Sequence, residues 1–170
     1  LIFCTSATGG LATSEGSPTR NAPLAEVKGW MYEGGTREPL MVRWPGHIEA
    51  GSTCSVPVTS PDFYPTLLEM AELDPIPQQH CDGVSIAPLL HGKSSLERDA
   101  IFWHYPHYGN QGGMPGSSVR CGDYKLIEFF EEGRIELYNL REDISEDRDL
   151  SQSEPETRTR LHALLVDWRR

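Results

Sequence analysis

The chain has 170 residues, enough to bury one ordinary hydrophobic core in one or two small domains. Its formal net charge is −10, and the excess lies in residues 126–156, which hold 11 acidic residues and three arginines. Because an acidic surface repels phosphate backbones, we expect no nucleic-acid partner. No apolar run approaches the roughly 20 residues that span a bilayer, so we expect no membrane partner either.

The four cysteines, Cys4, Cys54, Cys81 and Cys121, show no C-x-x-C spacing. A zinc or thiol-redox motif is therefore not expected, and disulfides are possible without being required by a chain of this size. The chain begins on an apolar, strand-like run at residues 1–3 with no methionine before it. We therefore expect it to be part of a longer chain whose other strands neighbour this run.

A glycine-rich loop between two predicted strands is the first candidate binding site. Residues 1–6 are predicted to form a strand, and the apolar run 40–42, bounded by prolines, is predicted to form an interior strand. Between them lie Lys28 and the segment 33–37, which contains two adjacent glycines and an arginine. A point charge, a forked donor and free amide groups suit an anion site. The alternative is an ordinary glycine turn with both cations solvated.

A helix is predicted from Ser60 onward. A hydroxyl N-cap, a proline and an acid stand in its first turn, and an apolar stripe follows at helical spacing. The stripe, expected to face a sheet, is Tyr64, Leu67, Leu68 and Ala71. The composition shifts near Ser94, so we divide the chain into an α/β portion at residues 1–93 and a small α+β portion at residues 94–170.

The second portion is predicted to be an antiparallel meander covered by a terminal helix. Strands are expected near 100–104, 118–121, 124–130 and 134–138, with two-residue connections at 122–123 and 132–133. Polar and apolar residues alternate irregularly over 124–130, so one face of the sheet is expected to be only partly buried. The acidic run 142–149 is predicted to be a solvated loop. A capping box at 153–156 precedes the apolar stripe of the last helix, which is Leu161, Leu164, Leu165 and Trp168.

Nearly the whole chain resembles the C-terminal half of the catalytic domain of the type I, formylglycine-dependent sulfatases, of the arylsulfatase and N-acetylgalactosamine-6-sulfatase kind. The first matching pieces are GGL at 9–11, KGW at 28–30, YEGG at 32–35 and RWPG at 43–46. The later ones are residues 82–92, 102–113 and 122–150. The resemblance implies part of an alkaline-phosphatase/sulfatase-like α/β sheet, followed by a small antiparallel sheet packed against a helix.

The resemblance also implies roles for individual residues. It gives Lys28 a catalytic and substrate-binding role, contacting the sulfate ester and stabilising charge on it. It places the loop of His104 and His107 near the active-site mouth, where each is either a substrate contact or a packed, hydrogen-bonded histidine. The family binds calcium through an aspartate and an asparagine, but the matching residues here are Ala7 and Thr8. These offer poor ligands to a hard cation, so no metal is expected for this chain.

The nucleophile of these enzymes is a formylglycine made from a cysteine or serine in a C/S-x-P/A-x-R motif. The sequence contains no such motif, because Pro57 stands one position too late after Cys54 and no arginine follows. No G-x-S-x-G elbow, G-x-G-x-x-G motif or P-loop occurs either. We therefore expect a part of a sulfatase that is inactive alone.

Other interpretations of the sequence stay open. One is a non-catalytic remnant that binds sulfate or a sulfated glycan, and another is an unnatural change at Ala7 and Thr8. The expected partners are a sulfated small molecule or glycan and the N-terminal part of the parent domain. The resemblance implies a periplasmic, secreted or lysosomal location, although the 170 residues contain no signal-sequence pattern and leave the location unknown.

Overall fold

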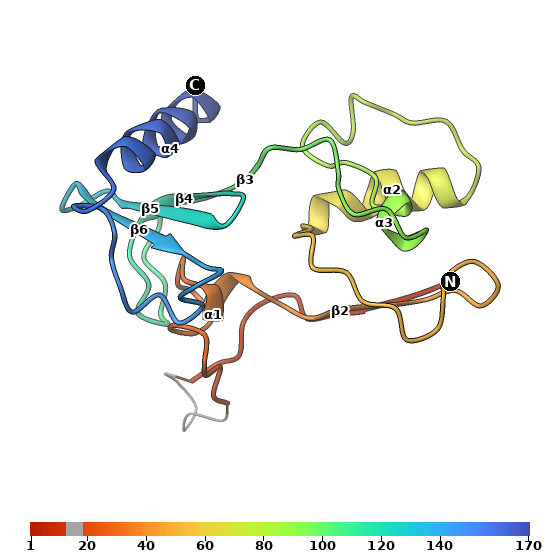
Figure 1. The fold of residues 1–170 in the computed structure, drawn as a ribbon, viewed down its shortest axis with the longest axis horizontal. Coiled ribbons are helices and arrows are strands. Elements are labelled where there is room, and N and C mark those ends of the chain that lie inside the picture. The colour runs from red at the N-terminus through yellow and green to blue at the C-terminus, as the bar shows by residue number, and fades with distance from the viewer. Residues whose placement is uncertain (13–18) are drawn as a thin grey trace. The chain divides into compact units, whose positions relative to one another are not determined.

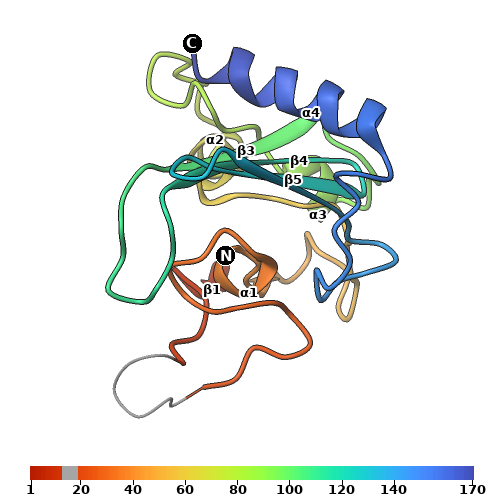
Figure 2. The same ribbon diagram turned by 90° about the vertical axis from the view of Figure 1, so that its left-hand side faces the viewer.

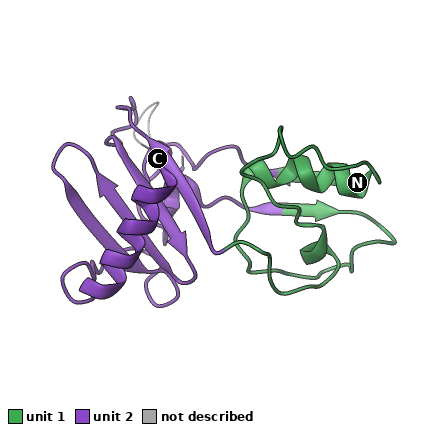
Figure 3. Cartoon of the chain, turned by 90° about the horizontal axis from the view of Figure 1, so that it is seen from above, with its two compact units in different colours: residues 1–4, 41–98 green, residues 5–40, 99–170 purple. Residues whose placement is uncertain are grey.

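The computed structural model describes residues 1–12 and 19–170 (Figure 1). Residues 11–21 are rich in serine, threonine and glycine, which predicts an exposed loop, and this segment lies partly outside the described residues. Two compact units are present, one formed by residues 1–4 and 41–98 and the other by residues 5–40 and 99–170 (Figure 3). The division at residue 94 stays a prediction, and by compactness residues 5–40 group with the later part of the chain. Within the described ranges, no helix has the length and apolar character needed to cross a membrane.

The two strands predicted at the start of the chain are present. Strand β1 (Ile2–Thr5) pairs with strand β2 (Leu40–Arg43) in a two-stranded sheet. The prediction that the second of these strands is an interior strand is wrong for the described chain, because Met41 is 60% exposed. A sheet of only two strands leaves much of its surface open.

The predicted helix of the first unit starts with the 3₁₀ turn η1 (Ser60–Asp62) and continues as helix α2 (Phe63–Met70). Its predicted buried stripe is wrong, because Tyr64 is 39% and Leu67 is 45% exposed while Thr66 is buried. The physical reason is a hydrogen-bonded polar face. The Thr66 hydroxyl donates to the Asp62 carbonyl (2.6 Å) and accepts the Ile86 amide (2.9 Å), just before helix α3 (Ala87–Leu90).

The predicted meander is confirmed in the second unit. Strands β3 (Ala100–Tyr105), β4 (Gly116–Cys121), β5 (Tyr124–Phe129) and β6 (Arg134–Asn139) form an antiparallel sheet in that order. The hairpin of β4 and β5 has the expected two-residue connection, residues 122–123, with Gly122 at a φ of 60°. The second connection spans residues 130–133, so the expected two-residue turn there is wrong. The register pairs Phe129 with Arg134, so β5 ends one residue earlier than expected, while β6 begins at Arg134 as expected and continues to Asn139.

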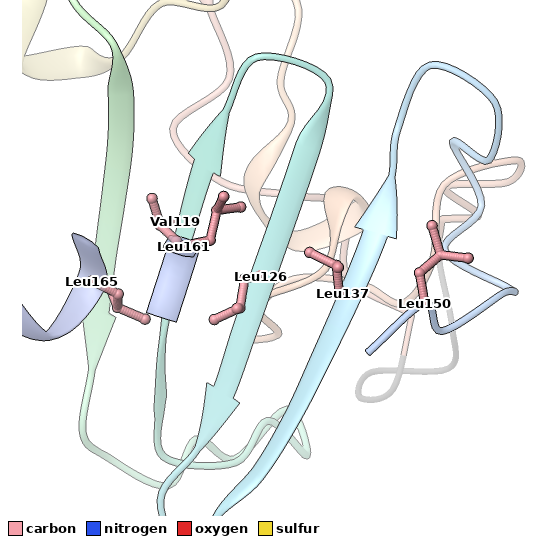
Figure 4. Close-up of a cluster of buried hydrophobic side chains, with 6 residues drawn as sticks. All are labelled: Val119, Leu126, Leu137, Leu150, Leu161 and Leu165. Atoms are coloured by element: carbon pink, nitrogen blue, oxygen red, sulfur yellow. The ribbon is translucent and has the colours of Figure 1, made fainter. Parts of the chain in front are cut away.

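Helix α4 (Pro155–Trp168) covers one face of this sheet, as predicted. The core between α4 and the sheet consists of Val119, Leu126, Leu137, Leu150, Leu161 and Leu165 (Figure 4). Trp168 stacks on Phe102 with ring centroids 4.8 Å apart. The predicted capping box is wrong, because Glu154 is the N-cap residue and makes no side-chain cap. The Ser153 hydroxyl instead donates to the Leu150 carbonyl (3.3 Å).

The opposite face of the sheet is covered too, so the prediction of a partly exposed face is wrong. Met31 and Tyr32, just before helix α1 (Glu33–Thr36), pack against a second buried cluster. Its sheet residues are Ile127, Phe129 and Tyr138. Figure 2 shows α4 and α1 on opposite sides of the sheet. The segment that contains Lys28 therefore belongs to the layer that covers the face of the C-terminal sheet opposite α4.

Candidate functional site

Lys28 lies in a loop whose backbone is tied to the segment after β1. Its amide donates to the Gly10 carbonyl (3.2 Å), and the Trp30 amide donates to the Val27 carbonyl (3.1 Å). The Lys28 side chain is half-buried, and its ammonium makes no hydrogen bond or ion pair with residues 1–12 or 19–170. A lysine held by its backbone, with an unpaired head group, is available to an external anion.

Asn21 joins three backbone segments around this loop. Its side-chain Nδ2 lies 3.1 Å from the Gly10 carbonyl, 3.0 Å from the Gly34 carbonyl and 3.4 Å from the Glu26 carbonyl. No sequence pattern singles out Asn21, because an asparagine beside a Ser/Thr/Gly-rich stretch is a common loop residue. Its contacts make it the residue that fixes the Lys28 loop to the segment after β1 and to α1.

Gly34 is a site of close backbone approach. Its amide donates to the Ala25 carbonyl (2.7 Å), and a Cβ at this position would overlap the Ala25 and Glu26 carbonyl oxygens. A Cβ on Gly9 would in turn overlap the Gly34 carbonyl oxygen. The pair of glycines in α1 is therefore a packing position, and Arg37 beside it pairs with Glu33 at 3.5 Å.

The connection between β3 and β4 docks onto the other side of the Lys28 loop. The Trp30 indole Nε1 donates to the Gln111 carbonyl (3.2 Å). Gly29 has a φ of 93°, which favours glycine, and a Cβ on Gly113 would overlap its carbonyl oxygen. The turn after Lys28 is thus in close backbone contact with the β3–β4 connection at Gly113.

The structure separates the two candidate histidines. His104 Nδ1 lies 2.7 Å from the Ser117 hydroxyl, and its strand neighbour Phe102 packs on the α4 side, opposite the layer that contains Lys28. His107 is exposed on the connection that docks onto the Lys28 loop, and its ring lies 5.5 Å from that of Tyr105. Lys28 and His107 therefore come from adjoining loops, whereas His104 lies on β3, on the other side of the sheet. Substrate contacts by any of the three stay predictions.

Ala7 and Thr8, the positions at which the resemblance predicts calcium ligands, do not fit that cation. Both residues are exposed, and the Thr8 carbonyl accepts the Ser6 hydroxyl (2.7 Å). Calcium takes about six to eight oxygen ligands, mostly from carboxylates and carbonyls. A methyl group and one neutral hydroxyl supply none of the charge that such a shell needs.

A buried ionic cluster joins α1 to the sheet. The Lys125 side chain is 0% exposed, and its Nζ lies 3.0 Å from Glu33 Oε1 and 3.2 Å from Glu146 Oε1. The Glu33 amide donates to Glu146 Oε2 (2.6 Å). Burial raises the pKa of Glu146, while the Lys125 charge opposes that rise. The prediction of a solvated acidic loop over residues 142–149 is wrong here, because Glu146 is only 6% exposed.

Two phenols, the buried Tyr138 and the half-buried Tyr32, lie beside this cluster. The hydroxyls of Tyr32 and Tyr138 donate to the same oxygen, Glu136 Oε2, at 2.7 and 2.9 Å. Both tyrosines line a hollow of about 360 Å³ whose walls include Glu26 and Glu146. These carboxylates repel an anion, so the hollow is not the expected sulfate site.

Alkaline titration is expected to reveal the two phenols. Burial raises the pKa of Tyr32 and of Tyr138, so the folded chain keeps protons that the unfolded chain loses. Their contribution to stability is therefore full below about pH 10 and is lost as the pH rises through the raised values. Urea unfolding between pH 8 and 11 should show this fall, and Tyr138→Phe should reduce it. The same slope in both proteins would contradict the assignment.

The sequence of the chain matches sulfatases. A family model described as "N-sulphoglucosamine sulphohydrolase, C-terminal" matches residues 27–169. A sulfatase of Formosa agariphila is 40% identical over 160 residues, covering 88% of this chain and 29% of the relative. Human arylsulfatase A is 41% identical over 107 residues, covering 62% of this chain and 20% of the relative. The chain thus spans less than a third of the length of these relatives.

Solved structures agree with the sequence matches and confirm the predicted fold. Ps i-CgsB, solved with k-i-k-neocarrahexaose, matches with a TM-score of 0.84 and 28% identity over 98% of this chain and 36% of that one. BT4656, solved with its substrate D-glucosamine-2-N,6-O-disulfate, matches with a TM-score of 0.73 and 30% identity over 81% of this chain and 29% of that one. The mixed α/β architecture, with its antiparallel sheet and helix, is that of sulfatases with an alkaline-phosphatase-like fold. The chain belongs to the sulfatases, in the family defined by the C-terminal region of N-sulphoglucosamine sulphohydrolase.

Proposed function

We propose that this chain is the C-terminal portion of a sulfuric-ester hydrolase and that Lys28 is its contact to the sulfate group. The observation that carries the proposal is the half-buried Lys28 side chain, whose ammonium is unpaired among the described residues in a loop held from three sides. A fixed cation beside a sulfate oxygen stabilises the negative charge that develops there. A sulfated small molecule or glycan is the proposed substrate class, which the ligands named for the two structural neighbours support.

The proposal includes the absence of turnover by this chain alone. The sequence offers no formylglycine motif, and Ala7 and Thr8 do not suit calcium. The pure 170-residue chain should therefore release no 4-nitrophenol from 4-nitrophenyl sulfate, with or without added calcium. Release above the buffer blank would contradict this part of the proposal.

A chimaera tests the contribution to catalysis directly. This chain would replace the matching segment of the Formosa agariphila sulfatase, with and without Ala7→Asp and Thr8→Asn. We expect calcium-dependent turnover only in the chimaera with both changes, because these supply a carboxylate and an amide ligand. Lys28→Ala in that active chimaera should lower the turnover number at least about a hundredfold. Unchanged turnover would remove Lys28 from the proposed role.

A second candidate function is binding without catalysis, favoured by the same unpaired ammonium in a chain with no nucleophile motif. Calorimetry with millimolar sulfate should then detect binding that Lys28→Ala weakens about tenfold or more, the loss expected for one charged hydrogen bond. Lys93→Ala is the matched control, because Lys93 is exposed and belongs to the other compact unit. No detectable binding by the unmodified chain would exclude this candidate.

A further inference from the structure

The first residue of α1, Glu33, is held by three residues from the C-terminal part of the chain. The Glu33 backbone amide donates to Glu146 Oε2 (2.6 Å), and the Glu33 carboxylate pairs with Lys125 (3.0 Å). Arg120 on β4 lies 3.7 Å from the same carboxylate. The three partners come from β4, β5 and the connection after β6. A displacement of α1 from the sheet would leave several of these buried groups unpaired.

The same short helix supports the Lys28 loop. Its Gly34 amide donates to the Ala25 carbonyl (2.7 Å), and the Gly34 carbonyl accepts the Asn21 side chain (3.0 Å). Asn21 also bonds to Gly10, whose carbonyl accepts the Lys28 amide. Continuous contacts therefore run from the ionic cluster through α1 to the backbone of Lys28.

Burying a charged cluster between a turn and a sheet carries a desolvation cost, and well-packed apolar residues at the same place give equal or greater stability. In some proteins buried charges instead specify a single packing arrangement, because each donor must meet its acceptor. Lys125 also lies 3.4 Å from the Thr36 hydroxyl, so it contacts the first and last residues of α1. We propose that Lys125 is a positioning residue, which fixes α1 and thereby holds the Lys28 loop in its anion-binding place. This inference rests on the proposed role of Lys28.

Hydrogen exchange measured by NMR tests the proposal without relying on a ligand. In Lys125→Met, exchange at the Lys28 amide and the Trp30 indole should accelerate at least about tenfold more than exchange at the Leu137 amide. Leu165→Ala is the matched control, because it destabilises the α4 side of the same sheet. It should accelerate exchange at Leu137 at least as much as at the loop. An equal acceleration of all sites in Lys125→Met would overturn the proposal.

Two further measurements keep the test decisive. If Lys125→Met does not fold, Glu146→Gln replaces it, because glutamine keeps an oxygen acceptor for the Glu33 amide and removes only the charge. Selective acceleration at the loop supports the proposal in that variant too, and uniform acceleration overturns it.

A sulfate titration then separates the positioning role of Lys125 from the anion-binding role of Lys28. If the unmodified chain binds no sulfate, the binding role of Lys28 fails, while the exchange pattern still decides whether Lys125 positions the loop.

Discussion

Replacing Lys125 with methionine is expected to lower the free energy of unfolding by about 3–5 kcal/mol. Methionine has a similar length and no charge, so it leaves Glu33 and Glu146 buried without the cation that lies 3.0 and 3.2 Å from them. Removing one partner of a buried ionic cluster costs more than the cluster contributes, because the remaining charges stay desolvated. Urea denaturation followed by circular dichroism measures the change.

A double-mutant cycle identifies the source of this loss. Glu146→Leu and Lys125→Met should each destabilise the chain, and the double variant should be more stable than their sum predicts by about 1–3 kcal/mol. Lys93→Met is the control for lysine replacement as such, since Lys93 is exposed. It should change stability by less than about 0.5 kcal/mol. Additive effects of the two cluster variants would show that the ionic contact does not explain the loss.

Gly113→Ala is expected to cost at least about 2 kcal/mol and to weaken sulfate binding. The added Cβ would overlap the Gly29 carbonyl oxygen, and a backbone atom cannot move aside as a side chain can. Either the β3–β4 connection or the turn after Lys28 must shift, which would break the bond from the Trp30 indole to the Gln111 carbonyl. Urea denaturation and sulfate calorimetry on the same preparation measure both effects.

Gly109→Ala provides a matched control in the same connection. A Cβ there would find its nearest neighbour, the Tyr105 hydroxyl, at an ordinary distance of 3.7 Å. We expect a stability change within about 0.5 kcal/mol and unchanged sulfate binding. Similar losses in the two alanine variants would mean that the connection tolerates no substitution in general, and the close approach to Gly29 would not be the cause.

Much of the second unit could be predicted because its signals are local. The glycine turn at residues 122–123 and the β-type residues on either side specify a hairpin without reference to the rest of the chain. The apolar spacing of Leu161 and Leu165 likewise specifies the inner side of α4, and both side chains are fully buried. In these segments the residues that determine the element lie within a few positions of one another.

Two of the errors concern polar residues whose partners lie far from them in the sequence. Lys125 and Glu146 have the composition of solvated positions, and only the fold reveals that each neutralises the other's charge. Thr66 is buried in place of the apolar stripe because Asp62 and Ile86 satisfy its hydroxyl. Periodicity counts apolar residues and contains no information about such pairs, so it assigns the wrong face to α2 and a half-open face to the sheet.

The candidate site was predictable only in outline. The glycine-rich segment and its lysine mark a place where backbones approach closely, and the contacts of Gly34 agree with this. No sequence pattern marks Asn21 as the residue that anchors the Lys28 loop. Placing His104 on the α4 side of the sheet requires the strand register, which the sequence pattern does not provide. The side of a strand on which a residue lies depends on a one-residue shift, which composition does not determine.

The long sequence separations in the layer that covers the sheet opposite α4 have a consequence for folding during synthesis. Glu33 and Glu146 are 113 residues apart, and Trp30 and Gln111 are 81 apart. The lysine loop therefore leaves the ribosome long before the strands that support it, and contacts of such range form late because loop closure must come first. A nascent chain stopped before residue 146 should remain sensitive to proteases around residue 28, and it should gain resistance only once the last strands and the final connection have emerged.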